Sequence, residues 1–260
     1  MKSILTAGEN RRIAKAMLEY SMLADGDRVL VAVSGGIDSL VLAWLLHIWR
    51  QKAPIEYELQ AVYVDMRPAG APEIKAGERA GLIRDRLAAL GISCQVIPGE
   101  LPVPLDARQS KGGADTSGLC FQCARNRRRL LFDHAREQGF QSIALGHHRD
   151  DIAETFFINL TCSGNISTMR PKQLLFSGRL ALIRPLAYLL KEEIQAIGGR
   201  LGLEPVPSDC PLSEQTRRQD IRGLLQHIYE QIPGSREHIF AALGNVRQEY
   251  LLVQESENQQ

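Results

Sequence analysis

The chain alternates between short, continuous runs of apolar residues and longer segments in which apolar residues recur at helical spacing. Continuous runs rich in Val, Ile and Leu are typical of strands buried on both faces, whereas helical spacing is typical of helices with one buried face. The expected strands are residues 29–33, 58–65, 92–97, 142–146 and 180–186. The expected helices are residues 9–23, 40–50, 72–91, 121–138, 150–162, 191–201, 213–231 and 235–253.

Strands that alternate with helices of this length predict right-handed crossovers and a parallel sheet. We therefore expect an α/β fold with a doubly wound, parallel, five-stranded sheet and a helical C-terminal appendage. The expected parts are an N-terminal helix (1–24), a central α/β domain (25–203) and a C-terminal part (204–260). Ligands of such folds bind beyond the carboxyl ends of the strands, where the strand order reverses. If the first and fourth strands are neighbours there, the segments that follow them face each other.

Composition and charge add little to this picture. The chain has 260 residues, 44% of them hydrophobic, and a net charge of +1, which are ordinary values for a globular protein. No stretch approaches the roughly 18 apolar residues of a membrane span. The N-terminus also lacks a signal-peptide pattern, so we expect a cytoplasmic protein with no membrane partner. Its five cysteines are an odd number, which favours metal, cluster or catalytic roles over a disulfide framework.

The segment Ser34–Ser39, SGGIDS, directly follows the first expected strand. Gly35 and Gly36 can adopt backbone angles that let successive N–H groups converge on one anion, and the helix that follows adds its positive dipole end. The segment lacks the Lys of a Walker loop, where Asp38 stands instead, and it lacks the G-x-G-x-x-G dinucleotide pattern. We expect a phosphate-binding loop of another kind. The alternative is an ordinary turn between strand and helix.

Acidic residues follow the fourth expected strand. Asp150 and Asp151 stand at its carboxyl end, and Glu154 comes one helical turn later. Paired carboxylates beside a polyphosphate suit Mg²⁺, which prefers oxygen ligands, and Asp38 in the phosphate loop suits the same ion. The alternative is that the acids cap the following helix, and the two interpretations are compatible. The adjacent pair His147–His148 is expected to touch phosphate or to line the pocket.

The spacing of the cysteines indicates a second site. Cys120 and Cys123 have the C-x-x-C spacing of metal ligands, but no partner motif completes a zinc finger. Cys210, bracketed by prolines, is the expected third thiolate, because Cys162 ends a helix whose other end carries the nucleotide site. Cys94 falls within a strand and is expected to be a small buried hydrophobe. An iron–sulfur cluster with one open iron position, a zinc ion completed by a His, and three unrelated cysteines are the alternatives.

Basic residues are clustered although the net charge is close to zero. One cluster follows Cys123 and the other follows Cys210. Their members are Arg125, Arg127, Arg128 and Arg129 in the first, and Arg217, Arg218 and Arg222 in the second. A run of charge is most often a solvated face, whereas arginines near a catalytic site are typical of contacts with nucleic-acid phosphates.

Together these motifs resemble the tRNA 2-thiocytidine synthetase family (TtcA), which belongs to the PP-loop ATP pyrophosphatases. The matching segments are collinear and span about residues 28–220: SGGIDSLVLAWLL, AVYVD, CFQCARNRRRLLFDHA, IALGHHRDDIAETFFINL, IRPLAYLLKEEI and SDCP. The resemblance implies an adenine-nucleotide α-hydrolase-like fold and ATP-dependent thiolation of a cytidine in the tRNA anticodon loop, through an adenylated base. The implied cofactors are ATP, Mg²⁺ and a [4Fe–4S] cluster, with zinc as the alternative. The implied partners are tRNA and a sulfur donor such as a cysteine desulfurase or free sulfide, and a homodimer is a further expectation.

The same resemblance assigns roles to residues. Cys120, Cys123 and Cys210 are expected to hold the cluster, whose free iron carries the sulfur. Asp38 is expected to act with them in catalysis and to bind Mg²⁺ together with Asp151. The expected ATP-binding residues are Ser34, Gly35, Gly36, Asp38, Ser39, Asp65, Gly146, His147 and Asp151. The expected tRNA-binding residues are Arg125, Arg127, Arg128 and Arg129.

Two features depart from the family pattern. Ile37 stands where family members commonly have Lys, which puts one phosphate contact in question. Cys210 lies in SDCPLSEQ rather than in a Pro-Cys-Asn-Leu-Cys context. Two other functions share part of the pattern. A lysidine-synthetase-like tRNA ligase uses the same loop and would leave the cysteines to a structural zinc. A nucleotide sensor of the universal-stress type would not turn over ATP, and the paired carboxylates and the C-x-x-C argue against it.

Overall fold

The first apolar run forms the strand at the centre of the sheet. The structure, a computed structural model, describes residues 4–68, 77–101, 117–207 and 217–252. In β1 (Asp27–Val33), Leu30 and Val31 point to opposite faces and both are completely buried. A strand that is apolar on both faces needs a layer of helices on each side, and the sheet has both layers.

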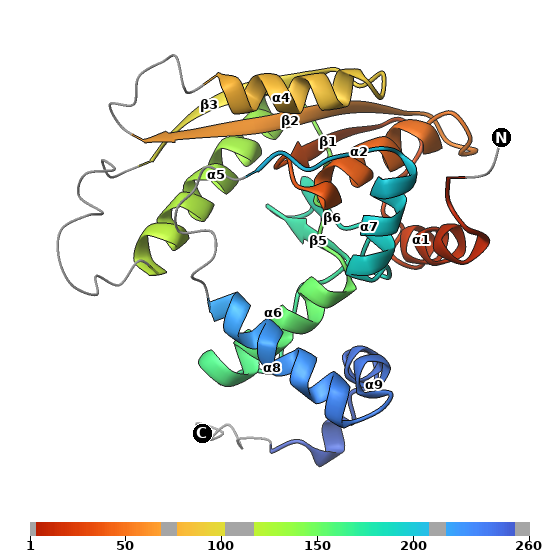
Figure 1. Ribbon diagram of the computed structural model, residues 1–260, viewed down its shortest axis with the longest axis vertical. Helices are drawn as coiled ribbons and strands as arrows, with labels where there is room; N and C mark the ends of the chain where they lie inside the picture. Colours follow the sequence, from red (N-terminus) through yellow and green to blue (C-terminus); the bar gives the residue numbers. More distant parts are fainter. Residues whose placement is uncertain (1–3, 69–76, 102–116, 208–216, 253–260) are drawn as a thin grey trace, which may run out of the picture. The chain divides into compact units, whose positions relative to one another are not determined.

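The described helices and strands follow the expected alternation (Figure 1). After β1 they are α2 (Ile37–Trp49), β2 (Tyr57–Pro68), α4 (Glu78–Ala88), β3 (Cys94–Leu101), α5 (Ser117–Glu137), β4 (Ser142–Ala144), α6 (Arg149–Cys162), β5 (Lys172–Leu175), β6 (Leu180–Ile183), α7 (Lys191–Arg200), α8 (Arg217–Gln231), α9 (Ser235–Ala242) and the short 3₁₀ helix η2 (Gln248–Tyr250). Before β1 comes α1 (Ala7–Glu19).

The strand order is β3-β2-β1-β4-β6-β5, so the sheet is wound outward in both directions from β1. Val31 of β1 pairs with Ala61 of β2 on one side and with Ala144 of β4 on the other, both in parallel. The predicted α/β class with a doubly wound sheet is confirmed. The adjacency of the first and fourth expected strands is confirmed as well.

The strand count of five is wrong, because the described sheet has six strands. The extra strand, β5, pairs antiparallel with β6, with Leu174 opposite Ala181. Its four residues, KQLL, lie on an edge and are half-buried or exposed. A short edge strand with a polar half carries no continuous apolar run, which is why hydrophobic periodicity does not reveal it.

Several element boundaries also differ. The helix expected over 72–91 is α4, which begins at Glu78, and residues 69–76 lie outside the described part. The last expected helix, 235–253, is too long, because α9 ends at Ala242. Gly244 and Asn245 follow that end, and both residue types favour turns over helix interiors.

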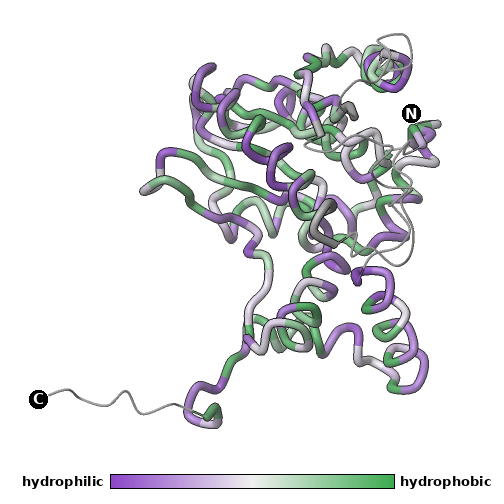
Figure 2. Tube along the Cα trace, turned by 90° about the vertical axis from the view of Figure 1, so that its left-hand side faces the viewer, coloured by the Kyte–Doolittle hydropathy of each residue, from purple (hydrophilic) through white to green (hydrophobic). Residues whose placement is uncertain are grey.

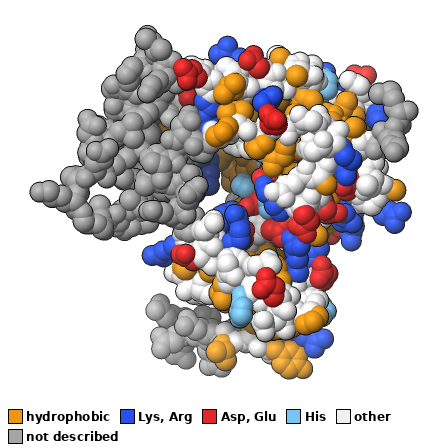
Figure 3. Space-filling model, viewed as in Figure 1, with side chains coloured by type: hydrophobic (Ala, Val, Ile, Leu, Met, Phe, Trp, Pro, Cys, Tyr) orange, Lys and Arg blue, Asp and Glu red, His pale blue; other side chains and the backbone are white. Residues whose placement is uncertain are grey.

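The two faces of the sheet have separate cores. Val29, Val31 and Val33 pack in a cluster with residues of α1, α2, α4 and α7. Leu30 and Ile143 pack in the other cluster with Leu131 and Ala135 of α5. Figure 2 shows hydrophobic stretches alternating with hydrophilic ones along the chain. On the face drawn in Figure 3, acidic and basic side chains are interspersed, in agreement with the net charge of +1.

The chain divides into two compact units. The first comprises Met1–Ile152 and Met169–Thr216 and contains the sheet. The second comprises Ala153–Thr168 and Arg217–Gln260, and its core is built from Ala153, Ile221 and Leu225. None of the helices in the described ranges is long and apolar enough to cross a membrane.

Helix α1 is part of the first unit and lies beside α7 (Figure 1). A capping box begins the helix: the side chain of Thr6 accepts from the N–H of Glu9, and the carboxylate of Glu9 accepts from the N–H of Thr6. The same carboxylate, only 4% exposed, accepts from Arg200 of α7 at 2.7 Å. Burial alone raises the pKa of Glu9, but the hydrogen bonds from Arg200 and Thr6 outweigh it, and the pKa is lowered from 4.5.

We predict that Glu9→Gln lowers the free energy of unfolding by about 1–3 kcal/mol at neutral pH, because it replaces a charge-assisted hydrogen bond. A lowered pKa stabilises the folded state above the unfolded pKa of 4.5, and that contribution is lost as the pH falls through the folded value. The difference between parent and variant, measured by urea unfolding, should therefore shrink below about pH 4.5. A difference that stayed constant down to pH 3 would contradict this account.

Candidate functional site

The loop after β1 forms a cradle at the N-terminus of α2. Gly35 has a φ of 86°, a left-handed conformation, and a Cβ there would lie 2.9 Å from Cδ1 of Ile83, so only glycine fits. Ser39 Oγ donates to the carbonyl oxygen of Gly36 at 2.9 Å and accepts from the N–H of Ser34 at 3.1 Å. Gly36 caps α2 without a side-chain hydrogen bond. The first turn of α2 therefore offers its N–H groups and dipole to an external anion.

The end of β4 lies against this loop. A Cβ on Gly146 would come within 3.1 Å of the backbone carbonyl carbon of Asp38 and of the backbone nitrogen of Ser39. Such contacts are tighter than a Cβ normally makes, and backbone atoms would have to move to relieve them. The glycine at position 146 thus favours the close approach of two backbone segments that are more than 100 residues apart in sequence.

A cavity of about 300 Å³ opens between the two segments. Its lining residues are Ala32, Val33, Ser34, Asp38, Ser39, Arg127, Leu145, Gly146, His147 and Asp151. Six of the nine residues that the family resemblance assigns to ATP therefore line one cavity. Gly35 and Gly36 shape the loop without appearing in the lining. Asp65 is buried in β2 and does not line this cavity.

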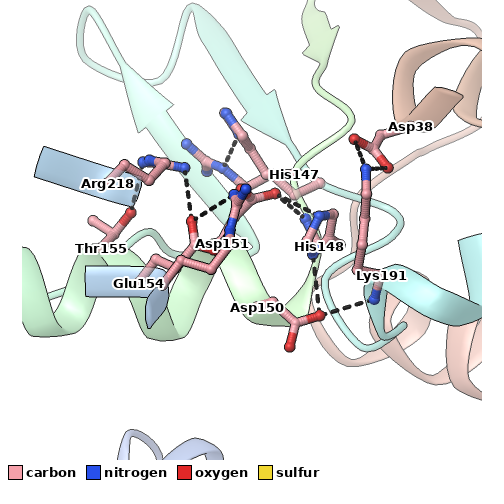
Figure 4. Close-up of polar contacts among 11 residues, drawn as sticks. Asp38, His147, His148, Asp150, Asp151, Glu154, Thr155, Lys191 and Arg218 are labelled. Carbon is pink, nitrogen blue, oxygen red and sulfur yellow. Dashed lines mark hydrogen bonds and ion pairs between the residues drawn. The ribbon is translucent and has the colours of Figure 1, made fainter. Parts of the chain in front are cut away.

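Lys191, the first residue of α7, reaches into the loop and binds Asp38. Its Nζ lies 2.6 and 2.7 Å from the two carboxylate oxygens of Asp38 (Figure 4). The sequence analysis did not identify this residue. The sequence does contain a signal for Lys191: a lysine at the start of a helix is unfavourable next to the positive end of the helix dipole, which predicts a nearby acid.

The helix of Lys191 is fitted closely to the phosphate loop. Ile37 packs against Gly198 of α7, where a Cβ would lie 2.4 Å from Cδ1 of Ile37. The apolar residue at position 37 is therefore a packing residue, and the cation nearest to Asp38 comes from α7 instead.

Arg79 and the segment after α7 support the loop from outside. Arg79 donates to the carbonyl oxygen of Ser34 at 2.7 Å and also to that of Pro207. The N–H of Val206 donates to the carbonyl oxygen of Gly35 at 2.9 Å. Two of these bonds fix carbonyl groups of the turn, and the third ties Arg79 to the segment after α7. Arg79 was not identified from the sequence either, although it too is a cation in the first turn of a helix, α4.

His147 has a defined tautomer. Arg184 Nε lies 3.2 Å from Nδ1 of His147, and because a guanidinium can only donate, Nδ1 accepts and the neutral ring carries its proton on Nε2. Burial, and to a lesser degree the positive charge of Arg128, lowers the pKa of Arg184 to about 10, so that its side chain stays charged at neutral pH.

His148 is only 3% exposed and lies between two carboxylates. Its Nε2 is 3.3 Å from Asp151 and its Nδ1 is 3.5 Å from Asp150 (Figure 4). Asp151 also accepts from the N–H of His148 at 3.0 Å, at the start of α6. Asp150 accepts from the N–H of Lys191 at 2.8 Å. Asp151 thus both caps α6 and lines the cavity, which agrees with the capping and the pocket interpretations together.

Glu154 does not line the cavity. It is buried in the second unit, where Arg222 lies 2.7 Å and Arg218 lies 3.7 Å from its carboxylate. Arg218 also donates to Thr155 at 3.2 Å (Figure 4). These contacts give two arginines of the second basic cluster a structural partner.

The carboxylates of the cavity fit a magnesium ion on a bound nucleotide. Within the described ranges, no group of three or more His, Cys, Asp or Glu side chains encloses a metal site. Mg²⁺ on a nucleotide needs only one or two carboxylates, because phosphates and water complete its shell. Asp38 and Asp151 line the same cavity and supply that number.

The cysteine site is described only in part. The side chain of Cys120, in α5, and all of Cys210 lie outside the described residues. Cys123 is half-buried, and Arg127 Nη2 lies 3.9 Å from its sulfur. Arg127 therefore connects the C-x-x-C to the cavity that it lines.

The other two cysteines do not line that cavity. Cys94 begins β3, is half-buried against the core, and has a pKa raised to about 11 by burial, so its thiol is protonated at neutral pH. Cys162 is exposed at the end of α6. Neither thiol lines the nucleotide-sized cavity between the phosphate loop and β4.

Comparison with known proteins agrees with this geometry. Residues 6–227 match the family described as PP-loop domain. The tRNA-cytidine(32) 2-sulfurtransferase of Pelobacter propionicus is 36% identical over 245 residues, covering 94% of this chain and 87% of the relative. The enzyme of the same name from Cellvibrio japonicus is 37% identical, covering 91% of this chain and 75% of the relative.

A solved structure supports the fold. The U34-tRNA thiolase NcsA from Methanococcus maripaludis, solved with its [4Fe–4S] cluster, superposes with a TM-score of 0.68 at 21% identity. The superposition covers 94% of this chain and 79% of that one. The phosphate loop, the neighbouring strands and the relatives agree, and this chain belongs to the PP-loop family and, within it, to the tRNA-cytidine(32) 2-sulfurtransferase (TtcA) family.

Proposed function

We propose that the chain is an ATP-dependent tRNA sulfurtransferase that replaces the C2 oxygen of a cytidine with sulfur. ATP adenylates that oxygen, pyrophosphate leaves, sulfur bonds to C2, and AMP departs with the oxygen. Relatives that this chain matches over more than nine-tenths of its length carry the corresponding name. The reaction takes place in the cytoplasm, where tRNA is found, with reduced sulfide or a cysteine desulfurase as the source of sulfur.

One observation carries the proposal: the loop Ser34–Ser39 and the end of β4 enclose one cavity at the carboxyl ends of adjacent parallel strands. The uncapped N-terminus of α2 faces that cavity with its N–H groups and dipole. Oriented dipoles of this kind stabilise the charge that develops on a departing pyrophosphate without reorganising during the reaction.

The charged residues of the cavity have separate tasks. Lys191 neutralises and orients Asp38, and its ammonium adds positive charge next to the phosphates. His147 lines the cavity, and because its Nδ1 accepts from Arg184, its Nε2–H is the group that can donate to a ligand. Mg²⁺, held by Asp38 and Asp151, would neutralise phosphate charge when bound.

Two observations support a cysteine site next to the same cavity. Arg127 touches both Cys123 and the cavity. The described chain before Cys210 ends at Pro207, whose carbonyl oxygen is bound by the arginine that supports the phosphate loop. Three residues of extended chain span at most about 11 Å. We propose that Cys120, Cys123 and Cys210 hold a [4Fe–4S] cluster, which would bind the sulfur atom from that source and deliver it to the cytidine.

Substitutions in the Asp38–Lys191 pair test the nucleotide site. Asp38→Ala should reduce ATP-dependent pyrophosphate release by at least about a hundredfold, the usual effect of losing one electrostatic contact in a transition state. Lys191→Met should weaken ATP binding by about 10- to 100-fold, because a hydrogen bond to a charged group contributes roughly 1.5–3 kcal/mol. Isothermal titration measures the binding. Lys52→Met, at an exposed lysine just beyond α2, is the matched control, and equal affinities in both lysine variants would refute the role of Lys191.

Gly146→Ala tests the close approach of the two segments. The new Cβ would press on the backbone of Asp38 and Ser39 and separate β4 from the loop. We expect a loss of about 1–3 kcal/mol in unfolding free energy and weaker ATP binding. Gly81→Ala, in α4 with no atom within 4 Å of its Cβ position, should be neutral or stabilising. Full ATP affinity in the Gly146 variant would show that the contact does not shape the site.

The third prediction concerns the cysteines. Ala variants of Cys120, Cys123 and Cys210, purified anaerobically, should lose iron, acid-labile sulfide and the visible absorbance of the cluster. The variants of Cys94 and Cys162 should keep them. ATP binding should be retained in all five variants, which separates cluster loss from misfolding. A Cys210→Ala protein with a full complement of iron and sulfide, or a parent that holds only zinc, would overturn the assignment.

A further inference from the structure

A second cavity, of about 1090 Å³, lies between α5 and the turn that joins β5 to β6, within the first unit. It shares no lining residue with the nucleotide cavity. We call it the arginine–phenylalanine groove, after the lining residues that distinguish it: Arg125, Arg128, Arg129, Phe132, Phe176 and Arg179. Ligand sites combine a concave shape and aromatic side chains with a few charged groups, so the groove is a candidate ligand site.

The groove is strongly basic. Five arginines and a single acid line it, and that acid, Asp133, is paired with Arg136 at 3.3 Å. Arg125, Arg128 and Arg129 have no carboxylate partner among the residues that the structure describes. Their side chains are exposed along one helix. Elsewhere in the described chain many arginines are paired, as Arg200 and Arg222 are, so unpaired charge is concentrated here.

The turn opposite α5 presents an aromatic ring at the cost of backbone strain. Phe176 and Ser177 have φ values of 52° and 56°, in the left-handed region that bulky residues rarely adopt. The ring of Phe176 is 54% exposed and meets Phe132 of α5 edge to face at 5.7 Å. Arg179 Nε donates to the carbonyl oxygen of Phe176 at 3.1 Å and holds the turn. Asn or Gly would fit the backbone better, so the ring itself is the feature that this turn provides.

Arginines beside exposed aromatic rings match one class of ligand. Guanidinium groups bind backbone phosphates, and unpaired bases stack on aromatic rings. The carboxylates of an acidic peptide would pair with the arginines but would not stack on the ring of Phe176 as a base does. We propose that the arginine–phenylalanine groove binds an unpaired segment of the RNA substrate, with phosphates on Arg125, Arg128 and Arg129 and one base stacked on Phe176. The inference depends on the proposed function in one respect only, which is that the bound RNA is a tRNA.

The variant Phe176→Asn removes the ring but keeps the turn, because asparagine tolerates the left-handed conformation. We expect it to bind RNA about 5- to 150-fold more weakly, the range for removal of one stacked base, while its melting temperature is unchanged or higher. Fluorescence anisotropy without ATP measures the binding, with a single-stranded RNA of about ten nucleotides and unmodified bulk tRNA as probes. Leu174→Asn, at an exposed residue of the same hairpin outside the groove, is the matched control. Phe176→Tyr keeps a ring and should bind like the parent.

Two results of this experiment would overturn the stacking contact. One is parental affinity in Phe176→Asn. The other is equal losses in Phe176→Asn and Phe176→Tyr, because a stacked base accepts either ring.

The arginines are tested by salt dependence. Gln substitutions at Arg125, Arg128 and Arg129 should each reduce the slope of log K against log salt by about 0.7, the value per phosphate on a single strand. Phe176→Asn should leave that slope unchanged. Arg11→Gln, at an exposed arginine of α1, is the charge-matched control. An unchanged slope in the triple variant would overturn the proposal, and displacement of RNA by polyglutamate at equal concentration would assign the groove to an acidic protein instead.

These outcomes are separate from those of the proposed function. If the parent thiolates tRNA but the groove variants bind RNA normally, the groove proposal fails and the sulfurtransferase stands. If the parent neither releases pyrophosphate nor thiolates tRNA while the groove variants lose RNA binding, the sulfurtransferase fails and the groove remains an RNA site.

Discussion

The site depends on the contact between two backbone segments at the ends of β1 and β4. A Cβ on Gly146 would lie only 3.1 Å from the backbone of Asp38 and of Ser39, so a larger residue would have to push the two segments apart. This approach is possible because β1 and β4 are parallel neighbours, so that both chains leave the sheet at the same edge. The cavity, the open helix N-terminus and the carboxylates on both sides follow from that one packing constraint.

Much of the fold and part of the site could be predicted from the sequence, because those parts depend on local patterns. Apolar runs indicated β1, β2, β4 and β6, and the motifs SGGIDS and GHHRDD marked the two walls of the cavity. The strand β5 was not predicted, because a short strand at the edge of the sheet needs no apolar run. Lys191 and Arg79 were not predicted as site residues, because their partners, Asp38 and the carbonyl group of Ser34, are distant in sequence. The local sequence indicates such a tertiary contact only weakly, through a cation at the start of a helix.

The arginines of the described chain fall into two groups, those with a partner inside the protein and those without one. Arg200 and Arg222 bind buried glutamates, and Arg184 orients a histidine, so their charge is used within the protein. Arg125, Arg128 and Arg129 of the groove have no carboxylate partner in the described chain. A net charge of +1 therefore hides a local excess of positive charge, and the sum over the sequence is a poor guide to what the surface attracts.

The contact between Ile37 and Gly198 has a consequence for how this site can evolve. A side chain at 198 would collide with Ile37 at 2.4 Å, so the two positions form one steric unit, and Lys191 lies on the same helix two turns earlier. A larger residue at 198 would be accommodated only with a smaller or differently oriented side chain at 37. Positions 37 and 198 should therefore change together, because the fit between α7 and the phosphate loop depends on both.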